Sequence, residues 1–294
     1  MLKAFLLAIC ILMLAAPAAV GQAAYGGTVG PAPIELALNA TEEGELTGVY
    51  LYAKIGTPIG LGGTLRRGVL TLTEPDAHGK PAATLTIPAF DARATRLTGT
   101  WRSLATGRHL PLVLAPRPAS EAAADGPRYE LLQTEGLKNN YFQTVLAGEP
   151  DNYATRVVAV RVLAKGTNRL VQQVAVDCQS QGLHSVSVGD FNFDGYPDFS
   201  VFESSYAGPN TTSLYYLYNP ATQRYAPSGF EGTSLEFDAK KRRVYEHNSC
   251  CAGSSVTSVE YKVVRNKLVE LARHCYRWDD KKEELVERPF SACQ

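Results

Sequence analysis

The stretch SVSVGDFNFDGYPDFSVF, residues 185–202, decides the fold of this chain. At its two ends, residues 185–189 and 199–202, apolar and polar side chains alternate, which is the period of a half-buried β-strand and differs from that of a helix. Between the ends, Asp, Asn and Gly residues favour a tight turn. The stretch therefore predicts two β-strands joined by a polar loop.

Similar alternating runs continue in both directions along the chain, separated by Gly, Pro and Asp turns. Examples are Ile34, Leu36 and Leu38 before this stretch, and Val259, Tyr261 and Val263 after it. The 25 Gly, 17 Pro and 15 Tyr residues, against 2 Met, also favour turns and strands. The sequence therefore predicts a mostly β fold.

The domain organisation follows from one segment of unusual composition. Residues 115–127 are rich in Pro and Ala, have little to bury and are typical of a linker. At ~100–200 residues per domain, the length of 294 residues suggests two modest domains. We expect an antiparallel β-meander domain in residues 23–114 and a second antiparallel β domain in residues 128–294.

The first residues indicate export. Lys3 precedes an apolar run, residues 4–16, and Pro17 and a series of small residues follow it, which is the order of a secretory signal peptide. The run is shorter than the ~20 residues needed to span a membrane. We expect a signal peptide in residues 1–22, with Cys10 inside it, and a periplasmic or secreted mature chain without a membrane span.

The other cysteines then lie in an oxidising compartment, where disulfides are the rule. They are Cys178, Cys250, Cys251, Cys275 and Cys293. We expect two disulfides, preferably one between Cys275 and Cys293, because residues 277–282 can reverse the chain, and one from Cys178 to either Cys250 or Cys251. The neighbours Cys250 and Cys251 are not expected to bond each other, because that bond strains the peptide between them. Without a C-x-x-C pair, a zinc site is not expected.

The central loop gathers oxygen ligands at alternate positions. The side chains of Asp190, Asn192, Asp194 and Asp198 and the backbone carbonyl of Tyr196 match the spacing of a calcium loop, and Gly195 permits the sharp turn. Val201 stands where an EF-hand has a bidentate Glu, and the flanks are strand-like, so we expect a Ca²⁺ loop between strands. The alternative is a metal-free Asx turn, in which the clustered carboxylates repel one another.

Charge and motif content exclude several function classes. The 29 Lys and Arg residues balance the 29 Asp and Glu residues, so no basic field exists to hold nucleic acid. His184, His247 and His274 have no matched nucleophile motif, and the best placed carboxylates belong to the metal loop. We therefore expect no catalytic residues and no enzymatic activity.

Four segments together resemble a family of bacterial periplasmic proteins with an incomplete β-propeller, related to the FG-GAP blades of integrins. They are LVQQV (170–174), VSVGDFNFDGYPDF (186–199), AGPN (207–210) and YYLYNP (215–220). The resemblance spans residues 129–293 and is strongest at the calcium loop. It implies an incomplete β-propeller-like fold for residues 128–294, with Ca²⁺ bound by Asp190, Asn192, Asp194, Tyr196 and Asp198.

The same resemblance implies a function. Members of the family are calcium-dependent lysozyme inhibitors and immunity proteins, which protect the cell wall from peptidoglycan hydrolases delivered through type IV secretion systems. We therefore expect an inhibitor whose protein partner is a lysozyme-like hydrolase. The candidate contact loop is Glu203, Ser204, Ser205 and Tyr206, because it follows the metal-bound strand and the ion could fix its position. The alternative is a calcium-stabilised secreted binding module for glycan or envelope protein, without an enzyme target.

Overall fold

The computed structural model describes residues 22–40, 46–123, 126–148, 155–206 and 208–293. The predicted signal peptide, residues 1–22, lies outside these ranges except for Gln22. Within them, the long elements are β-strands, and the helical segments are the short 3-10 helices η1 (Gly182–His184), η2 (Cys251–Gly253) and η3 (Phe290–Cys293). The predicted mostly β fold is confirmed. In the described part of the chain, no helix is long and apolar enough to span a membrane.

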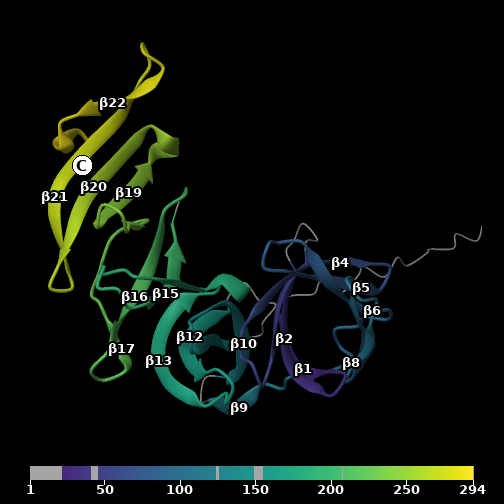
Figure 1. Cartoon of the computed structure of the whole chain (residues 1–294). Helices are drawn as coiled ribbons and strands as arrows, with labels where there is room; N and C mark the ends of the chain where they lie inside the picture. Colours follow the sequence, from purple (N-terminus) through teal and green to yellow (C-terminus); the bar gives the residue numbers. More distant parts are fainter. Residues whose placement is uncertain (1–21, 41–45, 124–125, 149–154, 207, 294) are drawn as a thin grey trace, which may run out of the picture.

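The first eight strands close into an antiparallel barrel (Figure 1). They are β1 (Ala23–Val29), β2 (Ala32–Ala40), β3 (Leu46–Tyr52), β4 (Ile59–Arg66), β5 (Val69–Pro75), β6 (Pro81–Ile87), β7 (Leu97–Ser103) and β8 (His109–Pro116). Each strand pairs with the next, as the predicted meander requires, and β1 also pairs with β8, with Tyr25 opposite Pro116. Inward side chains such as Tyr50, Leu70 and Leu85 fill the interior.

Gly27 lies at the seam where β1 meets β8. A Cβ atom at Gly27 would lie 2.0 Å from the carbonyl oxygen of Val113, so we expect Gly27→Ala to force the strands apart and to lower the free energy of unfolding by about 1–3 kcal/mol. Gly62→Ala in β4 is the matched control, because no atom lies within 4 Å of its added Cβ. Thermal denaturation should separate the two variants, and equal melting temperatures would contradict the closed seam.

The next sheet packs directly on the barrel. Its strands, in the spatial order β13-β12-β11-β10-β9, are β9 (Ser120–Ala123), β10 (Gly126–Gly136), β11 (Asn140–Ala147), β12 (Arg156–Ala164) and β13 (Leu170–Gln179). Residues 115–127, predicted as a linker, thus contribute the end of β8, all of β9 and the start of β10. Ala37, Val49 and Leu51, from the outer surface of the barrel, belong to the same buried cluster as Phe142 and Val160 of this sheet.

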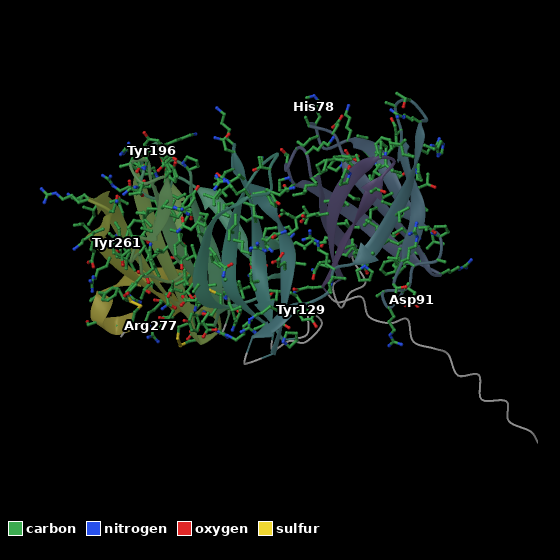
Figure 2. All side chains as sticks on the ribbon, turned by 90° about the horizontal axis from the view of Figure 1, so that it is seen from below. His78, Asp91, Tyr129, Tyr196, Tyr261 and Arg277 are labelled. Atoms are coloured by element: carbon green, nitrogen blue, oxygen red, sulfur yellow. A yellow bond between two sulfur atoms is a disulfide. The ribbon has the colours of Figure 1, made fainter. Side chains whose placement is uncertain are left out.

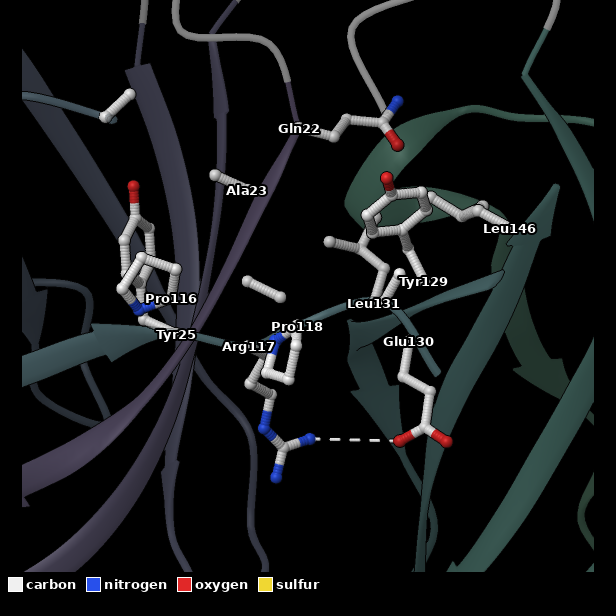
Figure 3. Close-up of a pocket in the computed structure, with 13 residues that line it drawn as sticks. Gln22, Ala23, Tyr25, Pro116, Arg117, Pro118, Tyr129, Glu130, Leu131 and Leu146 are labelled. Carbon is white, nitrogen blue, oxygen red and sulfur yellow. Dashed lines mark ion pairs between the residues drawn. The ribbon is translucent and has the colours of Figure 1, made fainter. Parts of the chain in front are cut away.

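Charged side chains reinforce this junction. Arg117 forms ion pairs with Glu35 of the barrel, at 2.7 Å, and with Glu130 of β10, at 3.9 Å. Gln143 of β11 donates a hydrogen bond to Glu35 at 2.9 Å. Figure 3 shows the Arg117–Glu130 pair at one side of a cavity of about 410 Å³ that lies between the barrel and the sheet. The barrel and the first of the following sheets therefore share an apolar core and a polar rim.

Two further antiparallel sheets complete the described chain. The first has the order β14-β15-β16-β17, and the second has the order β18-β19-β20-β21-β22. Their strands are β14 (Val186–Gly189), β15 (Asp198–Ser205), β16 (Thr211–Asn219), β17 (Arg224–Pro227), β18 (Glu236–Asp238), β19 (Arg243–Cys250), β20 (Ser255–Val264), β21 (Lys267–Asp279) and β22 (Glu284–Arg288). A small cluster with Phe191, Tyr215 and Phe230 at its centre, against which Phe237 packs, joins these two sheets. Figure 1 shows the last sheet at the end of the molecule away from the barrel.

The cysteine pairing agrees with the prediction in one bond and corrects it in the other. Cys275 and Cys293 are bonded, as predicted. Cys250 and Cys251 are bonded to each other, a pair that was not expected. They lie in the turn after β19, where Cys251 and Ala252 adopt positive φ angles. The predicted bond from Cys178 is wrong, since Cys178 is free and buried in the core of the first sheet after the barrel, apart from the exposed turn that carries the other two.

Candidate functional site

The predicted calcium loop connects β14 to β15, and its side chains curl inward onto its own backbone. Asp190 accepts hydrogen bonds from the backbone N–H groups of Asp194, at 2.9 Å, and Gly195, at 2.8 Å. Asn192 Oδ1 accepts from the Asp194 N–H at 3.1 Å, and Asp194 Oδ1 accepts from the Tyr196 N–H at 2.9 Å. Gly195 has a φ of 90°, a conformation that costs a side-chain-bearing residue energy. These bonds hold the loop in a tight, locally closed turn.

Asp198, the first residue of β15, is fully buried. Its two carboxylate oxygens accept hydrogen bonds from the backbone N–H groups of Phe191, at 2.9 Å, and Tyr218, at 2.8 Å. The pKa of Asp198 is raised to about 6, chiefly by burial; the hydrogen bonds oppose this rise, and the charges of Asp194 and Asp190 add to it. Asp198 therefore fastens the loop to β16, and negative charge accumulates around it.

The oxygen groups of this loop suit a hard cation. Within the described residues, no three His, Cys, Asp or Glu side chains form a metal-holding group by themselves. The predicted set also needs the Asn192 amide and the Tyr196 carbonyl, and oxygen ligands of these kinds are those that Ca²⁺ prefers. Each carboxylate oxygen has two lone pairs, so an oxygen that accepts one N–H bond keeps a lone pair for an ion. The residues present therefore fit Ca²⁺ in donor chemistry and in charge.

Phenylalanines alternate with the oxygen ligands and face the neighbouring sheet. The ring of Phe191 lies 4.8 Å from that of Phe237 in β18, and the ring of Phe193 lies 6.3 Å from it. Asn192 also donates a hydrogen bond at 3.1 Å to Asn266, in the turn between β20 and β21. The loop is thus the point at which the last two sheets meet. The alternation of Phe with Asp and Asn in residues 190–194 indicates that the two sides of the loop differ in polarity. Its partners Phe237 and Asn266 could not be found from the sequence.

The candidate contact residues Glu203, Ser204, Ser205 and Tyr206 form a strand end rather than a separate loop. Glu203, Ser204 and Ser205 end β15, and Tyr206 begins the turn to β16. Glu203 and Ser204 are half-buried, whereas Ser205 is exposed. Tyr206 is 58% exposed. Of the four predicted contacts, Tyr206 and Ser205 are therefore the accessible ones.

The calcium loop and Tyr206 lie at opposite ends of β15, which has 8 residues. At ~3.3 Å per residue this separation is roughly 23 Å. Any effect of the ion on the predicted contact residues must therefore run along the paired strands β15 and β16. Figure 2 shows Tyr196 of the loop at one edge of the last sheets and Arg277, near the end of β21, at the opposite edge.

The turn that carries Tyr206 is tied to the last sheet. Asn210 Nδ2 donates a hydrogen bond to the Ser249 carbonyl at 2.7 Å, and the Ser249 N–H donates to Asn210 Oδ1 at 2.9 Å. Between this turn and the Cys250–Cys251 turn lies a cavity of about 600 Å³. Tyr206 therefore stands beside a concave surface whose two walls are fastened to each other.

The tyrosines near the loop separate into two groups. Tyr215 and Tyr216 are buried, and Tyr216 stacks on Phe199 at 4.9 Å between ring centroids. These two are packing residues of β16. Tyr196 and Tyr206 are exposed by 45% and 58%, so a partner can reach them.

No family model and no curated protein matches this sequence. Among solved structures, the chain is similar to a Xanthomonas type IV secretion system related protein, with 14% identity and a TM-score of 0.35, over 58% of this chain and 97% of that one. It is also similar to hydrazine synthase of Kuenenia stuttgartiensis, with 9% identity and a TM-score of 0.26, over 91% of this chain and 95% of that one. At these TM-scores neither structure assigns a fold family or a function to the chain.

Proposed function

We propose that this chain is a periplasmic, calcium-dependent inhibitor or immunity protein against a lysozyme-like peptidoglycan hydrolase, with no catalytic activity of its own. In this proposal residues 128–294 form an incomplete β-propeller whose blades are the three sheets after the barrel. Support comes from the consecutive antiparallel order of these sheets and from the sequence resemblance at residues 129–293. The barrel is then an addition that shares a core with the first blade.

Calcium has a structural part in this proposal. Bound by Asp190, Asn192, Asp194, the Tyr196 carbonyl and Asp198, it would neutralise the carboxylates of the loop and hold the loop closed. The loop in turn orients Phe191 and Phe193 against Phe237. The ion therefore stabilises the junction of the last two blades.

One observation carries the inhibitory role: an exposed tyrosine stands beside a concave surface on a hairpin that is fixed at both ends. Asp198 fastens the start of β15 through the backbone of Tyr218, and Asn210 fastens the far turn through Ser249. A preformed loop loses little entropy on binding, and tyrosine is among the residues that dominate interface energies. The Tyr206 hydroxyl can donate to the carboxylates that line a glycoside hydrolase cleft.

Tyr206→Ala tests this surface. If Tyr206 is the anchor, the variant should inhibit the target hydrolase roughly 30-fold more weakly, which corresponds to the ~2 kcal/mol typical of an interface hot spot. The measurement is residual cell-wall hydrolysis at increasing concentrations of the full mature chain, with calcium present. Leu104→Ala is the control, because Leu104 is 43% exposed on a barrel turn. Equal inhibition by both variants would remove Tyr206 from the interface.

A further inference from the structure

The last sheet has one packed face and one open face. Val244, Ser255 and Cys275 are buried on the packed face, which meets η3 and the Phe191 cluster. The strand registers place the alternate residues on the other face, where none is buried. The residues of this open face include Tyr245, His247, Ser258, His274, Tyr276 and Trp278.

A row of rings runs along β21 on this face. His274, Tyr276 and Trp278 alternate along the strand, so successive rings are spaced by roughly 6.8 Å. The rings of His274 and Tyr276 are nearly parallel, with 23° between their planes and 6.2 Å between their centroids. Trp278 is 48% exposed, and Leu285 of β22 lies directly opposite it in the strand register. The rings therefore form an aromatic strip along β21, in which Trp278 is the most exposed and His274 and Tyr276 are half-buried.

Hydrogen-bonding groups border the strip and are held in position. Glu287 lies 2.7 Å from Nδ1 of His274, which fixes the imidazole and leaves Nε2 available. Beyond the His274 end of the strip, Glu260 of β20 lies opposite Ala272 and accepts a hydrogen bond from Arg243 at 3.0 Å. Ser258 stands opposite His274 in the register. A ligand lying on the rings would thus find Glu287 at one edge and further donors and acceptors around the His274 end of the strip.

The charges on this face indicate what kind of ligand fits. The carboxylates of the open face nearly balance its cations: they are Glu236, Asp238, Glu260 and Glu287 against Arg243, Lys262 and Lys267. A polyanion such as a nucleic acid finds no basic surface there. A pyranose ring presents an apolar face of C–H groups, which packs on aromatic rings, and a rim of hydroxyls, which need hydrogen-bonding partners. This face offers both.

We infer that the open face of the sheet β18–β22 binds a chain of neutral pyranose sugars, with Trp278 and Tyr276 as stacking platforms. The site goes beyond the proposed inhibition and lies on different residues. It would give the protein a glycan contact whether or not it also inhibits a hydrolase.

The chain contains two tryptophans, which allows a direct test. In a Trp101→Phe background, Trp278 is the sole tryptophan, and its emission is followed while chitotetraose, a neutral tetramer of N-acetylglucosamine, is added. We expect a saturable change in emission, and calorimetry on the wild-type chain should give the same dissociation constant. Trp278→Ala should weaken binding at least about tenfold, whereas Trp278→Phe, which keeps a ring, and Leu104→Ala on the barrel should bind nearly as well as the wild type.

The inference is overturned if wild-type protein gives neither heat nor an emission change with millimolar chitotetraose. It is also overturned if Trp278→Ala binds the sugar as the wild type does, or if this variant loses a hydrolase partner while no sugar binds, which would make the face a protein interface. Far-ultraviolet circular dichroism of each variant establishes that it is folded. Inhibition by Trp278→Ala should equal that of the wild type, so failure here is distinct from failure of the proposed inhibition.

Discussion

Replacing Asp194 by alanine should abolish the calcium-dependent stabilisation of this chain. Asp194 supplies a carboxylate to the proposed ligand set, and it also accepts hydrogen bonds from the Tyr196 N–H at 2.9 Å and from the Asn192 amide at 2.8 Å. In the wild type, calcium at a hundredfold excess over its dissociation constant should add about 2.7 kcal/mol. For a chain of this size that corresponds to a rise in melting temperature of about 5–10 °C.

Thermal melts with calcium and with chelator measure this difference, and calorimetry on metal-stripped protein measures binding directly. Asp280→Ala is the matched control, because Asp280 is an exposed aspartate in the turn between β21 and β22. The control should keep the calcium-dependent rise, and Asp194→Ala should lose it. If the wild-type melting temperature is the same with calcium and with chelator, the loop is a metal-free Asx turn.

Leu51→Ala should destabilise both the barrel and the sheet beside it. Leu51 is fully buried and, although it belongs to β3 of the barrel, it lies in the core shared with Phe142 and Val160. Removing a buried leucine side chain costs about 2–5 kcal/mol, depending on how far the cavity collapses. Ile55→Ala, in the turn that follows β3, is the control, because Ile55 is 59% exposed and should tolerate the change.

The two halves of the chain can be followed separately in this experiment. Trp101 in β7 reports on the barrel, and hydrogen exchange of the β11 and β12 amides reports on the neighbouring sheet. If the core is shared, Leu51→Ala should lower the stability reported by Trp101 and the exchange protection of the β11 and β12 amides together. Destabilisation of the barrel alone would contradict the shared core and would favour two independent domains.

The strands were predictable because alternation is a local property of the sequence. Runs such as Leu36 and Leu38 indicate which face of a strand is buried, without reference to the rest of the chain. Closure of the barrel was not predictable, because it depends on the register between β1 and β8, which are distant in sequence. The same holds for Leu51, whose outward side chain is buried only because another sheet covers it.

The candidate site was predictable to the extent that it is contiguous. The spacing of Asp190, Asn192 and Asp194 identified the loop, and the structure brings these side chains together through local hydrogen bonds. Phe237 and Asn266, which contact the loop, belong to the last sheet, and the sequence of the loop does not indicate them.

The cysteine pairing shows the same limit. The Cys275–Cys293 bond follows from a chain reversal between its two members. The Cys250–Cys251 bond lies in a turn where Cys251 and Ala252 have positive φ angles, and the residue types at these positions do not indicate such a turn.

The most direct test of the proposed function is the calcium dependence of inhibition. The mature chain, residues 23–294, is titrated into peptidoglycan hydrolysis by lysozymes and by any hydrolase that the chain retains from a periplasmic extract, first with calcium and then with chelator. We predict stoichiometric inhibition with calcium and a marked loss of inhibition with chelator at temperatures where the chain remains folded. Undiminished hydrolysis by every one of these enzymes, at micromolar excess of the calcium-loaded chain, would contradict the proposal.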